Sequence, residues 1–141
     1  MKIIQMSVFI ENTYGRLYGL CDVLGKNHIN IKALTLAETP DFAVVRIVAD
    51  KSEEAVKILK ENGFTATIAH IVAVEVPDTP GGLTDILKIL ADNKINIEYM
   101  YGFVEQKAHK AMMVFKFEDI DKALSILCAN NVSVVSKFQA C

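Results

Sequence analysis

The stretch Asp78-Thr79-Pro80-Gly81-Gly82-Leu83 follows an alternating apolar run and has a second copy earlier in the chain, Asn12-Thr13-Tyr14-Gly15-Arg16-Leu17. The two stretches lie 66 residues apart, and the same offset places Asn27 on Asn93 and Asn30-Ile31 on Asn96-Ile97. Internal repetition over such a distance indicates that one supersecondary unit is present twice. We therefore expect two copies of one unit within the 141 residues.

The two copies also align further along the chain, at an offset of 68 residues. Ala43 then corresponds to Ala111, and Leu59 corresponds to Leu127. The two extra residues lie near 106–109, where a turn between strands lengthens at little cost in free energy. Registers kept on both sides of one insertion are what duplication of a folded unit leaves behind.

Each copy shows the same succession of hydrophobic periods. Apolar residues alternate in 6–10 and 72–76, as in a strand, and recur at helical spacing in 17–24 and 83–90. Further strands begin at Ile29 and Ile95, hairpins turn near 40–41 and 106–109, second helices follow Asp50 and Asp119, and last strands span 65–69 and 132–138. The order β-α-β-β-α-β predicts a ferredoxin-like α+β fold, with an antiparallel sheet and helices on one face, in units 1–69 and 70–141.

Local signals at the ends of these elements lead to three further predictions. Residues 65–76 contain no glycine or proline, so we expect one continuous strand to join the units, with a tight turn near Ala69-His70 as the alternative. Pro80 suits the first helical position, which makes Thr79 the expected N-cap. Asn62-Gly63 is a typical helix end.

Composition and charge exclude several classes of protein. The net charge of −2 offers no basic surface for nucleic acid, and the apolar runs are too short for a membrane span. The N-terminus lacks the apolar stretch of a signal peptide, so we expect a cytoplasmic protein. Cys21 and Cys128 lie in apolar helical patterns and are expected to be core thiols, whereas Cys141 is expected to be exposed.

The sequence contains no recognisable catalytic or metal-binding set. His28, His70 and His109 are scattered, and neither a nucleophile elbow nor a phosphate-binding loop is present. We therefore expect a protein that is not an enzyme and that carries no metal and no cofactor.

The loop Asp78–Leu83 followed by Asn96-Ile97 resembles the ligand loop and second strand of ACT domains, and Asn12–Leu17 followed by Asn30-Ile31 resembles a divergent copy. The resemblance covers the whole chain, once per repeat. It implies a regulatory protein that binds a small molecule, an amino acid above all, where two ACT units meet. In serine-sensing members a histidine precedes the loop, and Ile10 and Val76 stand there instead, which argues against serine.

The resemblance and the chemistry of the loops define the candidate ligand-binding residues. Free N–H groups at a helix N-terminus attract a carboxylate, glycine permits close approach, and an asparagine amide both donates and accepts. The candidates are Asn12, Thr13, Tyr14, Gly15, Arg16, Leu17, Asn30, Ile31, Asp78, Thr79, Pro80, Gly81, Gly82, Leu83, Asn96, Ile97, Tyr99 and Met100. The same residue types also serve as turn and cap residues, so a purely structural role stays open for them.

The two loops differ in charge, which leaves two possibilities open. Arg16 suits a carboxylate and Asp78 suits an ammonium group, so the chain has either two unequal sites or one site and one relic. We expect a homodimer that covers sheet edges, and a partner enzyme or regulator that receives the signal. The alternative is a regulatory subunit or oligomerisation module that acts by sheet pairing without a ligand.

Overall fold

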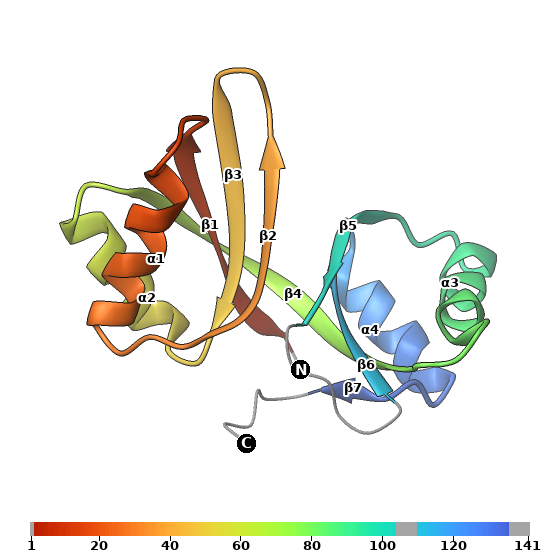
Figure 1. Cartoon of the computed structure of the whole chain (residues 1–141). Coiled ribbons are helices and arrows are strands. Elements are labelled where there is room, and N and C mark those ends of the chain that lie inside the picture. The colour runs from red at the N-terminus through yellow and green to blue at the C-terminus, as the bar shows by residue number, and fades with distance from the viewer. Residues whose placement is uncertain (1, 104–109, 136–141) are drawn as a thin grey trace. The chain divides into compact units, whose positions relative to one another are not determined.

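The computed structural model describes residues 2–103 and 110–135 of the chain. Its elements are β1 (Ile3–Glu11), α1 (Arg16–Lys26), β2 (Ile31–Glu38), β3 (Phe42–Ala49), α2 (Ser52–Glu61), β4 (Thr65–Pro77), α3 (Gly82–Asp92), β5 (Ile97–Gly102), β6 (Lys110–Phe117), α4 (Ile120–Ala129) and β7 (Val134–Val135) (Figure 1). The order is β-α-β-β-α-β twice, with β4 serving both copies. The predicted fold class is therefore confirmed.

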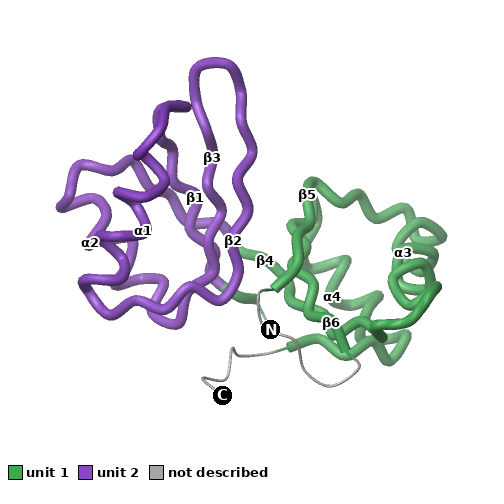
Figure 2. The backbone as a smooth tube through the Cα atoms, in the orientation of Figure 1, with its two compact units in different colours: residues 1–3, 70–141 green, residues 4–69 purple. Residues whose placement is uncertain are grey.

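The chain divides into two compact units, which Figure 2 colours separately. Residues 4–69 form one of them, here the N-terminal unit, and the residues from His70 onward, together with the first residues of the chain, form the C-terminal unit. Strand β4 runs without interruption from Thr65 to Pro77. The expected continuous strand is thus present, and the alternative of a tight turn near Ala69-His70 is wrong.

The strand registers of the two units repeat each other. In the N-terminal unit β1 pairs with β3, and Glu11 lies opposite Phe42. In the C-terminal unit β4 pairs with β6, and Pro77 lies opposite Lys110. The edge strands β2 and β5 carry a bulge at the equivalent place, between Ile31 and Ala33 and between Ile97 and Tyr99. These pairs reproduce the offsets of the sequence repeat.

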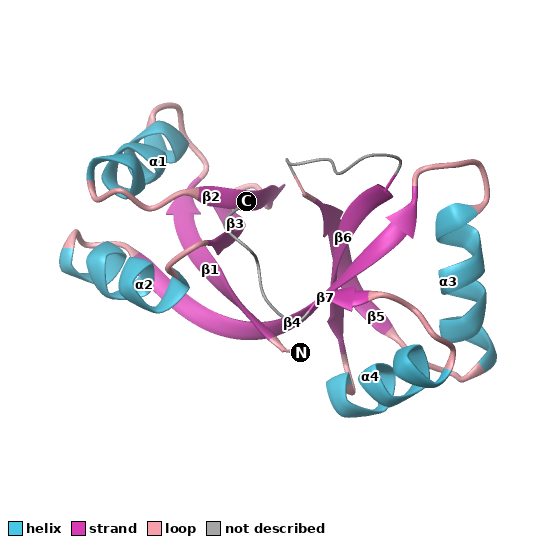
Figure 3. Ribbon diagram, turned by 90° about the horizontal axis from the view of Figure 1, so that it is seen from below, coloured by secondary structure: helices cyan, strands magenta, loops and turns pink. Residues whose placement is uncertain are grey.

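Each unit has its own core between its sheet and its two helices, which lie together on one face of that sheet (Figure 3). The N-terminal core contains Met6, Val8, Ile10, Leu20, Leu24, Val45, Ile47, Ala55 and Leu59. The C-terminal core contains Val72, Val74, Val76, Ile86, Leu90, Phe115, Phe117, Ala123 and Leu127. The buried faces predicted from the hydrophobic periods are confirmed, because alternation and helical spacing bring these side chains to one side of each element.

All four helices end in the same way. At each end an asparagine side chain donates from Nδ2 to the carbonyl oxygen four residues earlier, at 2.8 Å, and the next residue has a positive φ. The residue after that donates its N–H to a carbonyl five residues back, which is the Schellman arrangement. The four motifs are Asn27-His28-Ile29, Asn62-Gly63-Phe64, Asn93-Lys94-Ile95 and Asn130-Asn131-Val132. The predicted stop at Asn62-Gly63 is confirmed as one of four.

The predicted N-cap of α3 is wrong. The helix begins at Gly82, and Gly81 precedes it in the left-handed region with φ 84°. Thr79 instead lies in the turn before the helix, where its carbonyl oxygen accepts the N–H of Gly82 at 3.0 Å. A left-handed glycine thus turns the chain into the helix, so Pro80 stays outside it.

Other predictions are wrong by smaller margins. Cys128 is exposed because it lies roughly 100° around α4 from the buried Leu127, whereas Cys21 is half-buried and its burial raises the pKa of the thiol. Strands β2 and β5 start two residues later than expected, because Ile29 and Ile95 complete the helix ends. The turn at 106–109 with His109, the residues 136–138 and Cys141 lie outside the described residues.

Two glycine substitutions test the helix ends. We expect Gly63→Ala to destabilise the chain by about 1 kcal/mol, because Gly63 has φ 84° and side chains disfavour that conformation. Gly19→Ala, inside α1, should stabilise it by about 1 kcal/mol through helix propensity. An added Cβ meets nothing within 4 Å at either position, so the backbone alone distinguishes them. Urea unfolding measures both, and shifts of equal sign would contradict the assignment.

Candidate functional site

The loop between β4 and α3 is held against the end of its strand. A Cβ atom added to Gly82 would lie 2.1 Å from the backbone oxygen of Pro77 and 3.1 Å from its carbonyl carbon. Backbone atoms cannot yield to such an overlap as the end of a flexible side chain does. Gly82 therefore fixes how closely the first turn of α3 approaches β4.

A pocket of about 320 Å³ lies beside this contact, wholly within the C-terminal unit. The volume is near the lower limit for small-molecule sites, so a ligand of metabolite size fits it. Strand β4, one face of α3, the start of β6 and the segment before β7 contribute its lining, which is Glu75, Pro77, Gly82, Asp85, Ile86, Ile89, Lys110, Asn131, Val132 and Ser133.

Glu75 organises the polar side of the pocket. Its Oε2 atom lies 3.3 Å from Lys110 Nζ and accepts the Ser133 hydroxyl at 3.3 Å. The Glu75 N–H also donates to the backbone oxygen of Ser133 at 2.9 Å. The carboxylate is thus positioned by two different segments, and about a quarter of the side chain remains exposed.

The α3 side of the pocket adds a second kind of polar group. Gly81 has no side chain to cap the helix, so first-turn N–H groups are left without a capping acceptor. These groups and Lys110 favour a negative charge, whereas Glu75 and the first-turn Asp85 favour a positive one. Ile86, Ile89 and Val132 are apolar. The lining therefore matches a small molecule with both charges and an apolar part.

The N-terminal unit has different chemistry at the equivalent positions. The repeat and the strand registers place Phe9 where the other unit has Glu75, Phe42 where it has Lys110, Gly19 where it has Asp85, and Arg16 where it has Gly82. Phe9 and Phe42 are 43% and 59% exposed. The two loops are consequently unequal in side-chain chemistry although their backbones correspond.

Asn12 has a structural partner in its own unit. Its Nδ2 atom donates to Glu38 Oε2 at 3.3 Å and to the backbone oxygen of Thr39 at 3.2 Å. These bonds connect the end of β1 with the hairpin between β2 and β3. The residue is exposed, so the same amide remains reachable from solvent.

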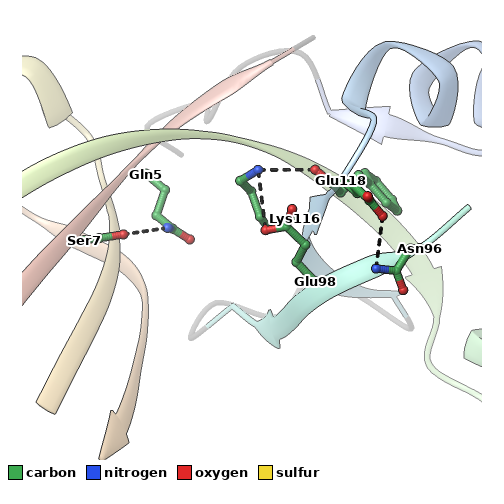
Figure 4. Close-up of polar contacts among 7 residues, drawn as sticks. Gln5, Ser7, Asn96, Glu98, Lys116 and Glu118 are labelled. Atoms are coloured by element: carbon green, nitrogen blue, oxygen red, sulfur yellow. Dashed lines mark hydrogen bonds and ion pairs between the residues drawn. The ribbon is translucent and has the colours of Figure 1, made fainter.

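Asn30 and Asn96 begin the edge strands and bind the ends of the neighbouring strands. The Asn30 N–H donates to Asp50 Oδ1 at 3.0 Å, and Asn96 Nδ2 donates to Glu118 Oε2 at 3.4 Å (Figure 4). Within one unit this end of the sheet is opposite to the loop end, because Ile31 pairs with Ala49 while Glu11 pairs with Phe42. The structure does not bring Asn12 and Asn30 of one unit together.

The remaining candidates divide between exposed loops and core. Thr13, Tyr14, Gly15, Arg16, Asp78, Thr79, Pro80 and Gly81 are solvent-exposed. Leu17, Ile31, Leu83, Ile97 and Met100 pack against the cores, and the Tyr99 ring stacks on Tyr101 with centroids 6.5 Å apart. Of the candidates from the sequence, Gly82 lines the pocket.

Sequence reasoning missed the charged residues of the pocket, Glu75, Asp85 and Lys110. A usable signal was present, because these positions are charged in one copy and Phe9, Gly19 and Phe42 in the other. A charge that appears in one copy of a repeat, at a place where the other is uncharged, indicates a role that is not part of the common fold.

Neither a metal cluster nor a membrane helix is found among the described residues. Within 2–103 and 110–135, no three His, Cys, Asp or Glu side chains gather as a metal site requires. No helix in the same part of the chain combines the length and the apolar character needed to cross a bilayer.

Comparison with known proteins places the chain in a family. Residues 1–140 match the family model described as an ACT domain pair. The chain belongs to the ACT domain pair family. The resemblance noted in the sequence is therefore confirmed, and an ACT pair is a regulatory domain.

Solved structures agree with this assignment. Protein BT0572 from Bacteroides thetaiotaomicron is 34% identical, with a TM-score of 0.90 over 96% of this chain and 92% of its own. The regulatory subunits of aspartate kinase from Thermus thermophilus and Thermus flavus share the fold, at 18% and 17% identity and TM-scores of 0.63 and 0.60. These matches cover 89% and 91% of this chain and 91% and 90% of those subunits. No curated protein matches the sequence.

The close approach at Gly82 can be tested by adding one methyl group. We expect Gly82→Ala to destabilise the chain by about 1–3 kcal/mol, because the backbone of Pro77 must move to admit the new Cβ. Gly102→Ala is the control, since its Cβ would lie 3.8 Å from Met113 Sδ, an ordinary contact. Thermal unfolding compares the two, and an equally mild effect at Gly82 would contradict the tight packing.

Proposed function

We propose that this ACT domain pair is a non-catalytic regulatory protein that binds an α-amino acid with an apolar side chain. The site proposed is the pocket of the C-terminal unit. The observation that carries the proposal is the placement of Glu75, Lys110 and the first turn of α3 around one small space with apolar walls.

The charges of the pocket favour a zwitterion. Lys110 and the N-terminal amides of α3 suit the α-carboxylate, whereas Glu75 and Asp85 suit the α-ammonium group. Ile86, Ile89 and Val132 then contact the side chain. The lining holds two carboxylates against one ammonium group, so a second carboxylate on the ligand is repelled. Aspartate and glutamate should therefore bind less well than leucine, isoleucine, valine or methionine.

The wider regulatory role also belongs to the proposal. Subunits with this fold in Thermus species are regulatory subunits of an enzyme, aspartate kinase. By analogy, the chain acts on a partner enzyme or regulator, as a homodimer in the cytoplasm. The N-terminal loop, residues 12–17, is on this view a second and unequal site, in which Arg16 replaces Gly82.

Thermal melting against the twenty amino acids tests the proposed ligand class. A ligand that binds the folded state stabilises it by about 2.7 kcal/mol at a hundred times its Kd. For a chain of this size that raises Tm by several degrees. We expect the increase with apolar amino acids and none with aspartate or glutamate. No shift with any of the twenty would refute the proposal.

A pair of matched substitutions tests the position of the site. Glu75→Gln keeps the size of the side chain but removes the charge that faces the ammonium group, so we expect binding at least tenfold weaker. Glu98→Gln is the control in the same unit, because Glu98 Oε2 lies 3.9 Å from Lys116 Nζ but does not line the pocket (Figure 4). Isothermal titration gives both affinities, and an equal loss in the two variants would place the ligand elsewhere.

A module that acts without a ligand is the second candidate. The exposed aromatic side chains of the N-terminal unit favour it, since Phe9, Tyr14, Tyr18 and Phe42 all face solvent in the chain alone. That function predicts association with another protein while no amino acid changes Tm.

A further inference from the structure

Strand β2 is an open edge of the sheet. The strands follow the order β2-β3-β1-β4-β6-β5, and among the described residues β2 pairs with β3 alone. An edge strand of eight residues presents N–H and C=O groups that a further strand can bind. Its sequence contains neither proline nor glycine, and Leu36 is 43% exposed. The common protections against pairing are therefore weak here.

The sequence of β2 is symmetric about Thr35. The segment Ala33-Leu34-Thr35-Leu36-Ala37 reads the same in both directions, and it lies after the bulge, where the pairing with β3 is regular. Two antiparallel copies centred on Thr35 would set Leu34 against Leu36 and Ala33 against Ala37. Every residue would thus face an identical one, and cross-strand Thr–Thr and apolar pairs are favourable.

The charges at the two ends of this segment agree with the same arrangement. Lys32 precedes it and Glu38 follows it, so antiparallel copies bring opposite charges to each end. Other registers lose this match. A shift that centres the pair on Leu36 would set Glu38 against Leu34, and one that centres it on Leu34 would set Lys32 against Leu36. Because residues two apart share a face, the register through Thr35 alone keeps like beside like.

The other edge strand lacks this symmetry. Centring β5 on Met100 would set Glu98 against Gly102, which leaves a charge without a partner. The self-complementary edge therefore belongs to β2 alone among the two edges of the described sheet.

We propose that two copies of the chain associate by antiparallel pairing of β2 with β2, with the two-fold axis through Thr35. The axis is perpendicular to the sheet, because paired residues of an antiparallel ladder point to the same face. The pairing does not depend on the proposed ligand, whose pocket lies in the C-terminal unit.

Cysteine cross-linking tests the register. In a chain with Cys21, Cys128 and Cys141 replaced by alanine, we expect Thr35→Cys to form a disulfide-linked dimer under mild oxidation. Opposed residues of a ladder lie about 4.5–5.5 Å apart between Cα atoms, within the range of a disulfide. Ala37→Cys is the control, because its copies would lie four residues apart along the strands, roughly 13 Å.

The outcomes on a non-reducing gel are distinct. A dimer with cysteine at 35 and a monomer with cysteine at 37 support the proposed register. A dimer at 37 alone means pairing in a different register, and equal yields mean random collision, so either result overturns the proposal.

Sedimentation equilibrium tests the interface without cross-linking. We expect Leu36→Glu to weaken self-association at least tenfold, because it sets a charge against Leu34 of the second copy. Ile68→Glu is the matched control, since Ile68 is a 47% exposed strand residue of β4. A monomeric wild-type chain, or equal losses in both variants, overturns the proposal. The amino-acid response of Leu36→Glu in thermal melting shows separately whether the pocket still binds.

Discussion

Each helix of this protein must stop at a fixed residue and return the chain to the sheet, and one hydrogen-bonded motif does this at all four places. In α1 the N–H of Ile29 bonds to the oxygen of Leu24, and both side chains are buried in the same core. The polar and apolar parts of the motif therefore act together, since the bond closes the helix while the contact anchors the following residue. Strands β2 and β5 can begin two residues later because that anchor is in place.

The duplicated backbone carries two different chemistries. The strand registers and the left-handed glycines Gly15 and Gly81 are the same in both units, so the loops begin their helices alike. Gly82 and Arg16 then differ, and so do the charged and aromatic residues on the strands nearby. A shared scaffold fixes positions, whereas the side chains at those positions decide which molecules bind. Divergence after duplication has left the C-terminal unit with the polar pocket.

The edge strand relates the predicted loop residues to one another. Within a unit, Asn12 and Asn30 lie at opposite ends of the sheet, so they do not form one site there. Antiparallel pairing through Thr35 would set the start of one β2 beside the end of the other. Asn30 of the second copy would then approach the hairpin to which Asn12 donates. The symmetry of five residues thus bears on which residues share a site.

The sequence by itself determined the duplication, the order of strands and helices, the buried faces and the continuous β4. These depend on local periodicity and on a repeat that alignment of the chain with itself reveals. Only the tertiary structure decided that Gly82 meets Pro77, that Thr79 does not cap α3 and that Cys128 is exposed. It also joined Glu75, Lys110 and Ser133, which are far apart in sequence, through the pairing of β4 with β6 and β7. Contacts across strands depend on register and on the approach of one backbone to another, and the pattern of a single segment contains neither.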